Sequence, residues 1–406
     1  MFEYVCVAAL ALGVSLGAFA QARVVGFDDD GMITIDGKRT LIIGSYYEAK
    51  SDRPYAELKD AGFNLVHTGN DAAAMDKAHA AGLLTWVSVG AIEPQDKEAS
   101  SKKVVDAVLK AKEHPSLAFI ETVDEPAWTF MKPEARVPWQ VLAETYAMIK
   151  QTDPNHLVYT NQAPTNLVKT LKAYNAGTDI VACDIYPVNP GGLNPMFALF
   201  PDGYQGDLNN ERISQVGEYV DKMRQVTGPN RPLLMVLQAF AWGALEDELG
   251  LKERREEKIL YPTYAESRFM AFQSLIKGAN GIVYWGSHTM PQPSQPWDDL
   301  KRVTREAAAL AEVLAARTAP LALALDYHEM GHSVDDGVQV LAKEHEGHMY
   351  MFTCNADKNI CKVTMAGLGD WSQCAVLNEN RTLPVERGAI TDTWRRFDVH
   401  IYKFGK

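Results

Sequence analysis

The sequence predicts an α/β fold, namely a (β/α)8 TIM barrel followed by a small antiparallel β-sandwich domain. Three observations predict this arrangement. Eight short apolar runs alternate with segments of helical period between residues 41 and 317. These runs lack polar–apolar alternation, which is typical of parallel strands that are buried on both faces. After Pro320 the runs alternate in polarity and turn residues separate them, as in antiparallel sheets.

The eight apolar runs are the expected barrel strands, because each ends near a polar or aromatic residue and a helical segment follows. They are LIIGSY (41–46), FNLVHTG (63–69), LLTWVSVG (83–90), LAFIETVDE (117–125), LVYTNQ (157–162), DIVACDIY (179–186), LLMVLQ (233–238) and GIVYWG (281–286). Eight strand–helix units in about 280 residues agree with the ~250 residues that such a barrel takes. Residues 299–317 are the expected closing helix.

The expected domain boundaries follow from these patterns. Residues 23–322 form the barrel domain, which begins with a hairpin over 24–39 that turns at DDDG. Residues 323–406 form the β-sandwich, whose expected strands are 338–344, 348–355, 361–367, 374–380 and 397–404.

Residues 1–22 are interpreted as a signal peptide, because Val5 to Ala20 is apolar and small residues follow. The run is short for a membrane span. Its first residues carry Glu3 and no Lys or Arg, which is atypical of a signal, so a buried helix or a wrongly assigned start codon is the alternative. The interpretation predicts a secreted or periplasmic protein without a membrane anchor.

Charge and cysteine content exclude several classes of function. The net charge is −12 and no basic block occurs, so nucleic acid and anionic membranes are poor partners, whereas a neutral polysaccharide is not repelled. Cys183 is an expected core thiol. Cys354 and Cys361 flank the turn NADKN, so a disulfide could form across this hairpin. The pairing among Cys354, Cys361 and Cys374 stays open. The spacing of the cysteines matches no zinc-binding pattern, and we expect no metal and no cofactor.

Polar and aromatic side chains gather at the carboxyl ends of the expected strands, where barrels of this kind place their active sites. They are Tyr46, Glu48, His67, Ser88, Asp124, Glu125, Asn161, Asp184, Tyr186, Gln238, Trp285 and His288. No phosphate-binding loop is evident. Hydrogen-bonding groups with aromatic walls suit a carbohydrate, whose hydroxyls need polar partners and whose ring stacks on Trp or Tyr.

The fourth strand, FIETVDEPAW, contains the strongest candidates for catalytic residues. Period two would place Glu121 and Glu125 on one face and Asp124 on the other, and Pro126 would end the strand. A carboxyl at that rim in a partly apolar surrounding would have a raised pKa and could act as a general acid. The alternative is an acidic helix start that favours the helix dipole.

These segments resemble glycoside hydrolase clan A, the cellulase and β-galactosidase superfamily of barrel enzymes. The clan's fourth strand typically ends in Asn-Glu-Pro with another Glu four residues earlier, and this chain has Glu121 and then Asp124-Glu125-Pro126. Further resemblances lie in IDGKRTLIIGSYY (35–47), AGFNLVHTG (61–69), DIVACDIYP (179–187) and GIVYWG (281–286), although many members carry Arg in place of His67. The resemblance implies a secreted glycosidase with Glu125 as the general acid/base. It also implies a nucleophilic Glu at the end of strand seven.

Strand seven ends instead in Gln238, which is no nucleophile. No Glu occurs between residues 219 and 245, so a shifted alignment does not supply one. Three alternatives stay open: a different carboxylate replaces it, the substrate's own 2-acetamido group attacks with help from Asp124, or the protein binds carbohydrate without cleaving it. The replacement carboxylate would be Asp184, Glu48, Glu93 or one of the loop acids Glu246, Asp247 and Glu248.

The remaining residues receive substrate-binding roles in this prediction. Gln238 is expected to bind a sugar hydroxyl, and Trp285 is expected to stack against the sugar ring. His67 is expected to shift the pKa of a neighbouring carboxyl, Glu121 or Glu125. Asn161, Tyr186, Tyr46, Glu121, His288 and Trp242 complete the expected substrate-binding set. The long segment 189–210 is expected to shape the substrate cleft.

Overall fold

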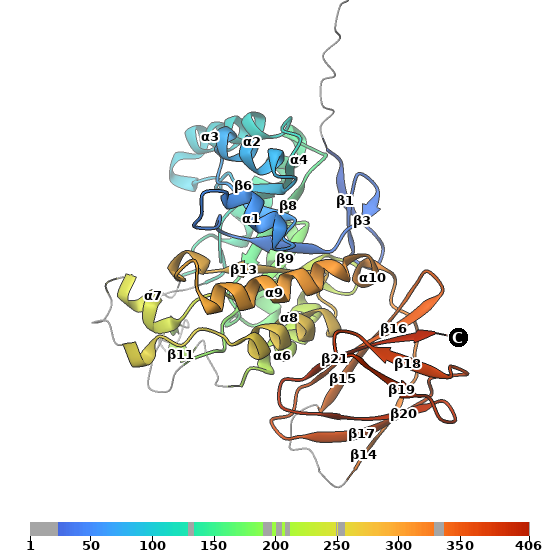
Figure 1. Cartoon of the computed structure of the whole chain (residues 1–406). Helices are drawn as coiled ribbons and strands as arrows, with labels where there is room; N and C mark the ends of the chain where they lie inside the picture. Colours follow the sequence, from blue (N-terminus) through green and yellow to red (C-terminus); the bar gives the residue numbers. More distant parts are fainter. Residues whose placement is uncertain are drawn as a thin grey trace, which may run out of the picture.

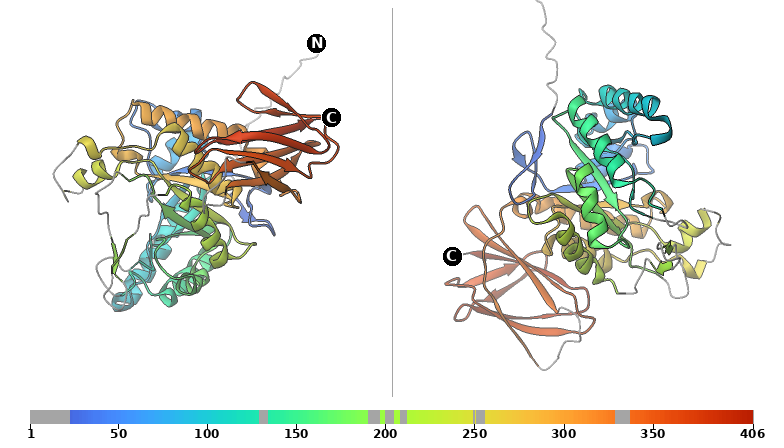
Figure 2. Two further views of the ribbon diagram at one scale, coloured as in Figure 1. Left: turned by 90° about the horizontal axis from the view of Figure 1, so that it is seen from below. Right: turned by 180° about the vertical axis from the view of Figure 1, so that it is seen from behind.

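The computed structural model describes residues 23–128, 134–189, 197–199, 205–207, 212–248, 250, 256–328 and 337–405. Two parts are visible in Figure 1: a barrel wrapped by helices, and a β-sandwich coloured red that lies against its side. Figure 2 shows the same arrangement from below and from behind.

The first part is a closed barrel of eight parallel strands in the order β12-β13-β4-β5-β6-β7-β8-β9. The strands are β4 (Ile42–Ser45), β5 (Leu65–His67), β6 (Leu84–Ser88), β7 (Leu117–Glu121), β8 (Leu157–Gln162), β9 (Ile180–Ile185), β12 (Leu233–Gln238) and β13 (Gly281–Trp285). All eight predicted strands are therefore confirmed. Parallel pairing in a closed ring brings all eight carboxyl ends to one rim.

Helices cover the outside of the barrel. They are α1 (Pro54–Asp60), α2 (Ala72–Ala80), α3 (Lys97–Ala111), α4 (Trp139–Thr152), α5 (Val168–Tyr174), α6 (Gln215–Thr227), α7 (Trp242–Glu248), α8 (Tyr264–Ile276), α9 (Gln295–Ala309) and α10 (Ala311–Ala315). Single 3-10 turns are η1 (Pro94–Asp96), η2 (Asn175–Gly177), η3 (Glu256–Lys258) and η4 (Ser287–Thr289). The expected closing helix is divided into α9 and α10 at Leu310. Within the described residues, no helix is long and apolar enough to cross a membrane.

The N-terminal hairpin contributes to the barrel core. Strands β1 (Val25–Phe27) and β2 (Ile33–Ile35) pair antiparallel, and β3 (Lys38–Arg39) pairs with β2. Val25, Ile33 and Ile35 are buried in the same apolar cluster as the inward-facing barrel residues, such as Leu65 and Val236. The predicted hairpin is confirmed.

The second part consists of two antiparallel sheets, β15-β16-β21-β18-β19 and β14-β17-β20. Their strands are β14 (Ala324–Tyr327), β15 (Val338–His345), β16 (His348–Asn355), β17 (Cys361–Ala366), β18 (Gln373–Val376), β19 (Arg381–Pro384), β20 (Ala389–Trp394) and β21 (Val399–Gly405). A further short hairpin pairs β10 (Phe197–Leu199) with β11 (Gln205–Asp207) in the segment after β9. The predicted sandwich is confirmed, and β14, β19 and β20 are additional strands.

The sandwich is joined to the barrel through α8. The Phe272 ring on α8 stacks on Phe352 of β16, with 6.4 Å between centroids. Arg268 forms a buried ion pair with Glu306 of α9 and donates to the Val399 carbonyl of β21 at 2.7 Å.

The described cysteines are all free thiols, so the disulfide between Cys354 and Cys361 that the sequence left open is not formed. Cys361 and Cys374 are instead buried in the core of the sandwich, and Cys354 is buried in the apolar cluster that it shares with residues of α8. Cys183 is buried as predicted.

Candidate functional site

Side chains at inward positions meet at the carboxyl rim of the barrel. On β9, Ile180 and Ala182 belong to the inner apolar cluster, so strand alternation turns Asp184 inward as well. The same alternation applies to Asn161 above Tyr159 on β8 and to Trp285 above Val283 on β13. The rim therefore collects the polar residues that the sequence placed at the strand ends.

The segment after β7 departs from the predicted strand geometry. β7 ends at Glu121, and residues 122–125 form a bend in which Glu125 has φ = 47°. The strand therefore ends four residues earlier than predicted, and period-two alternation does not apply beyond Glu121. Glu125 still lies at the rim: its N–H donates to the Asn161 carbonyl at 3.0 Å, and its carbonyl accepts from Trp128 N–H at 3.0 Å.

Glu125 and Asp184 form a hydrogen-bonded pair of carboxyl groups. Glu125 donates and Asp184 accepts. Burial, the Asp184 charge and the Asp124 charge raise the pKa of Glu125 well above its usual value. Burial and the Asp124 charge raise the pKa of Asp184 to about 7. Two close carboxyls titrate as a pair that retains one proton near neutral pH, and the hydrogen bond assigns that proton to Glu125.

Asn161 links this pair to Asp124. Its Nδ2 donates to Asp124 Oδ1 at 3.0 Å and to Asp184 Oδ1 at 3.2 Å. Asp184 and Asn161 are buried, whereas Asp124 is exposed to solvent. Asp124, Glu125, Asn161 and Asp184, together with Glu121, are called the acidic cluster below.

Arg136 is a functional neighbour that the sequence did not indicate. Its Nη1 lies 3.2 Å from Glu125 Oε2 and donates to the Asp124 carbonyl at 3.2 Å, and its guanidinium lies 4.5 Å from the centre of the Trp128 ring. It belongs to the loop before α4, where no strand or helix pattern signals a contact with the end of β7. Its side chain is 39% exposed, so solvent screens its charge.

Glu121 lies deeper in the barrel and has no cationic partner. Its Oε2 accepts from Ser88 Oγ at 2.8 Å and from Trp86 Nε1 at 3.3 Å. Burial and the Asp124 charge raise the pKa of Glu121 to about 7. His67 Nε2 lies 2.9 Å from Ser88 Oγ, and burial lowers the pKa of His67 to about 4. His67 is therefore neutral near pH 7. Its Nε2 lies 3.8 Å from Glu121 Oε2, so the expected hydrogen bond to that carboxyl is replaced by a link through Ser88.

Gln238 lies at the end of β12, as predicted, but the backbone occupies its amide. The side chain is fully buried; Oε1 accepts from Val188 N–H at 2.9 Å, and Nε2 donates to the carbonyls of Val188 at 2.8 Å and Phe240 at 3.1 Å. These contacts do not support the prediction that Gln238 holds a sugar hydroxyl, since both of its N–H groups already have partners. They indicate that Gln238 fixes the chain that leaves β9.

Four aromatic residues pack together after the ends of β9, β12 and β13 and are called the aromatic cluster: Tyr186, Phe240, Trp242 and Trp285. Tyr186 stacks on Trp285 with 5.6 Å between centroids, and Phe240 meets Trp285 edge-on at 5.1 Å. Trp242 is buried, and its Nε1 donates to the Tyr186 carbonyl at 3.2 Å. Tyr186 and Trp285 thus lie together as predicted, and Trp242 packs against them.

Three further predicted residues border these clusters. The Tyr46 hydroxyl lies 2.9 Å from that of Tyr159, at the base of the acidic cluster. His288 lies 3.9 Å from the Tyr47 ring and 5.8 Å from the Trp285 ring, centroid to centroid. Tyr159 and Tyr47 are partners that the sequence did not single out. Tyr159 is a buried strand residue and resembles an ordinary core residue, and Tyr47 is a half-buried residue just after β4.

The other acids considered for strand seven are not assembled with Glu125. Glu48 and Glu93 are exposed. Glu48 is hydrogen-bonded to Tyr55, and burial together with the Glu48 charge raises the pKa of Tyr55. The side chains of Glu246, Asp247 and Glu248 lie outside the described residues, as does most of the segment 189–210. Among the described carboxylates, Asp184 is therefore the partner of Glu125.

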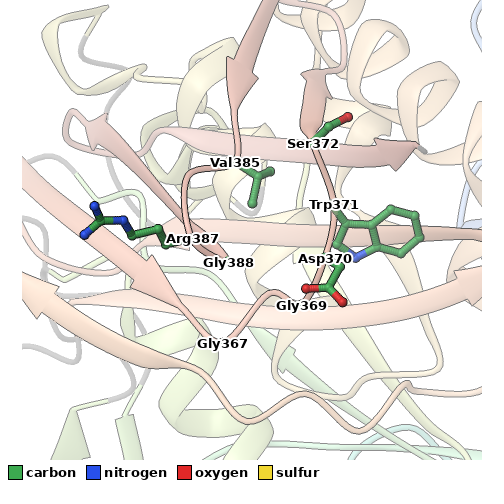
Figure 3. A pocket seen from close by; sticks show the side chains of 8 residues that line it. All are labelled: Gly367, Gly369, Asp370, Trp371, Ser372, Val385, Arg387 and Gly388. Atoms are coloured by element: carbon green, nitrogen blue, oxygen red, sulfur yellow. The ribbon is translucent and has the colours of Figure 1, made fainter.

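A separate cavity of about 550 Å³ lies in the sandwich, between the loops 367–372 and 385–388. Its lining includes Trp371, Asp370 and Arg387. Figure 3 shows the Trp371 and Arg387 side chains extending in opposite directions, so they do not converge on one ligand. The barrel rim, where carboxyls converge, is the better candidate for chemistry.

Comparisons with known proteins agree with this fold. No protein-family model matches the sequence, and no curated protein sequence is significantly similar. Among solved structures, an α-amylase from Geobacillus thermoleovorans in complex with acarbose has a TM-score of 0.57 at 10% identity and covers 90% of this chain and 98% of its own. A protein described as a glycoside hydrolase has a TM-score of 0.56 at 12% identity and covers 95% and 97%.

A glycoside hydrolase family 5 protein from Bacteroides vulgatus has a TM-score of 0.57 at 11% identity and covers 94% of this chain and 93% of its own. At these identities the similarity concerns the fold. The chain therefore has the (β/α)8-barrel fold of glycoside hydrolases, with a β-sandwich after the barrel.

Proposed function

We propose that the protein is a glycosidase that hydrolyses O-glycosidic bonds of an oligo- or polysaccharide at the acidic cluster. The observation that carries the proposal is the hydrogen-bonded pair of Glu125 and Asp184 at the rim of a barrel shared with glycoside hydrolases. Acid–base cleavage of a glycosidic bond needs one protonated and one ionised carboxyl on opposite sides of that bond. In this proposal the substrate therefore enters between Glu125 and Asp184 and replaces their hydrogen bond.

In this proposal Glu125 is the general acid and Asp184 is its ionised partner. Glu125 protonates the leaving oxygen, which is effective because burial and two neighbouring acids keep its proton at neutral pH. Asp184 then stabilises the positive charge that develops on the sugar or accepts a proton from the attacking water. Trp285 and Tyr186 offer apolar faces for the sugar ring.

A second candidate mechanism has a specific observation in its favour. No carboxylate is present at the end of β12, and Asp124 directly precedes Glu125 and is held by Asn161. An aspartate in this place can orient a 2-acetamido group of the substrate, which then attacks in place of an enzymatic nucleophile. A strict requirement for an N-acetylated sugar would favour this mechanism.

The test is hydrolysis of a panel of glycans by the wild type and Glu125→Gln. We expect the variant to lose at least about 100-fold of kcat, as removal of a general acid does, while its melting temperature and its sugar binding stay close to those of the wild type. Asp76→Asn, an exposed change on α2, serves as the matched control. Sugar binding by a wild type that cleaves no glycan would establish a carbohydrate-binding protein and refute the enzyme.

Export is a separate proposal that rests on residues 1–22 alone. Fractionation of cells that express the full chain, followed by N-terminal sequencing of the product, tests it. A mature protein that begins near residue 23 outside the cytoplasm supports export, and an intact N-terminus in the cytoplasm overturns it.

A further inference from the structure

We infer that the acidic cluster binds a cationic amino sugar, that is, a sugar with a free ammonium group in place of one hydroxyl. This inference rests on the proposed function and adds a substrate class to the same site. Two independent observations carry it: the balance of charge at the rim, and buried acceptor atoms without a donor.

The balance of charge is negative. Four carboxyl groups lie in the acidic cluster, on Glu121, Asp124, Glu125 and Asp184, and the Arg136 guanidinium is the cation in contact with them among the described residues. Burial raises the pKa of Asp124, whereas the hydrogen bond from Asn161 and the Arg136 charge favour its ionised form. With Asp124 ionised, this carboxylate and the Glu125–Asp184 pair, which shares one proton, carry more negative charge than Arg136 offsets. Such a site repels uronic acids and phosphorylated sugars, and it attracts a cation.

The second observation is unsatisfied hydrogen-bond capacity. Glu121 Oε1 and Asn161 Oδ1 are buried and have no partner, in side chains whose other polar atoms are bonded. The Glu121 side chain is 6% exposed and the Asn161 residue is 4% exposed. Because buried acceptors without donors are costly, they indicate a ligand that donates. An ammonium donates three hydrogen bonds and accepts none, so it suits this site better than a hydroxyl does.

Access is compatible with such a ligand. Asp124 is exposed, and Asn161 connects it to the buried Asp184. A cationic group that reaches Asp124 from solvent therefore lies next to Asn161, whose Nδ2 bridges the Asp124 and Asp184 carboxyls and whose Oδ1 is an unused acceptor. By contrast, both N–H groups of Gln238 are occupied by backbone carbonyls, so β12 adds no donor for an anionic substituent.

The experiment compares matched sugars that differ in one group. Glucosamine with glucose, galactosamine with galactose and mannosamine with mannose are titrated into the full-length protein, and the three N-acetyl derivatives and Tris are added as further probes. We expect the amine of at least one pair to bind about tenfold or more tightly than its hydroxyl counterpart, with a preference that declines at high salt. Binding of Tris with no sugar preference would show a general cation site and overturn the inference.

Two variants sharpen the result. Asp124→Asn and Glu121→Gln should each reduce the ratio of amine affinity to neutral-sugar affinity several-fold, and Asp106→Asn on the exposed face of α3 should leave this ratio unchanged. Equal affinity within every pair, or no binding of any amine, overturns the inference. Hydrolysis of neutral glycans that is lost in Glu125→Gln would then leave the proposed function standing, whereas amine binding without hydrolysis would refute the proposed function and not the inference.

Discussion

The two sides of the barrel rim differ in how their polar side chains are used. On the side of β7, β8 and β9, carboxyls contact carboxyls, and three buried acceptors, Glu121 Oε1, Asn161 Oδ1 and Gln162 Oε1, have no partner. On the side of β12 and β13, Gln238 is buried and bound to backbone atoms, and the aromatic cluster packs there. The first side is poor for stability and suited to chemistry, whereas on the second side every polar atom of the Gln238 amide has a partner.

This difference shows that the end of a strand does not by itself make a residue functional. Asn161 and Gln238 are both amides at inward strand ends and both are buried. Asn161 holds two carboxylates and retains a free carbonyl oxygen, while Gln238 holds Val188. The partners of a buried amide, which the sequence does not show, decide between the two roles.

The largest expected effect comes from removing the ionised partner of Glu125. Asp184→Asn should lower kcat by about 10²–10⁴, the range of a lost acid–base group, because the amide neither stabilises a cationic sugar nor accepts a proton. Steady-state kinetics on the best substrate measure it. Asp184 would have no catalytic role if kcat changed no more than it does in the exposed variant Asp76→Asn.

A carboxylate placed at the end of β12 tests the other side of the rim. Gln238→Glu should not create a nucleophile, because the side chain is buried and would face the carbonyls of Val188 and Phe240. The lost donors and the buried charge should lower the free energy of unfolding by about 3–5 kcal/mol at pH 8. Urea unfolding measures this, with Gln151→Glu on the surface of α4 as the control. A gain in activity, or unchanged stability, would contradict the structural role of Gln238.

Sequence patterns predicted the barrel because its eight strands are apolar runs whose period and spacing are local properties. They also predicted that Glu125, Asp184 and Asn161 lie at one rim, since parallel strands share a carboxyl end. They did not predict the bend at residues 122–125 or the contact of Arg136 with Glu125. These depend on loop conformation and on residues that are distant in the chain, for which periodicity carries no information.

A smaller effect is expected at Glu121, whose raised pKa makes the free energy of unfolding depend on pH. Its folded pKa of about 7 exceeds the usual 4.5, so the folded state binds more protons between these values and the free energy of unfolding falls as pH rises from about 4.5 to about 7. Glu121→Gln removes this loss. Its free energy of unfolding should therefore rise by about 3 kcal/mol relative to that of the wild type between pH 4.5 and pH 8. Urea unfolding across this range measures the difference. A difference that is constant with pH, as expected for the exposed control Glu98→Gln, would refute the raised pKa.

The smallest effect concerns Arg136, the cation that borders the acidic cluster. The guanidinium 3.2 Å from Glu125 favours the ionised form and lowers the pKa of Glu125 against the stronger effects of burial and the neighbouring acids. Arg136→Met should therefore shift the alkaline limb of the kcat/KM profile to higher pH by less than about one unit, since solvent screens a half-exposed charge. Lys102→Met on α3 should leave the profile unchanged. A shift to lower pH would mean that Arg136 acts through the shape of the loop and not through its charge, because loss of a neighbouring cation can only make a carboxyl harder to ionise.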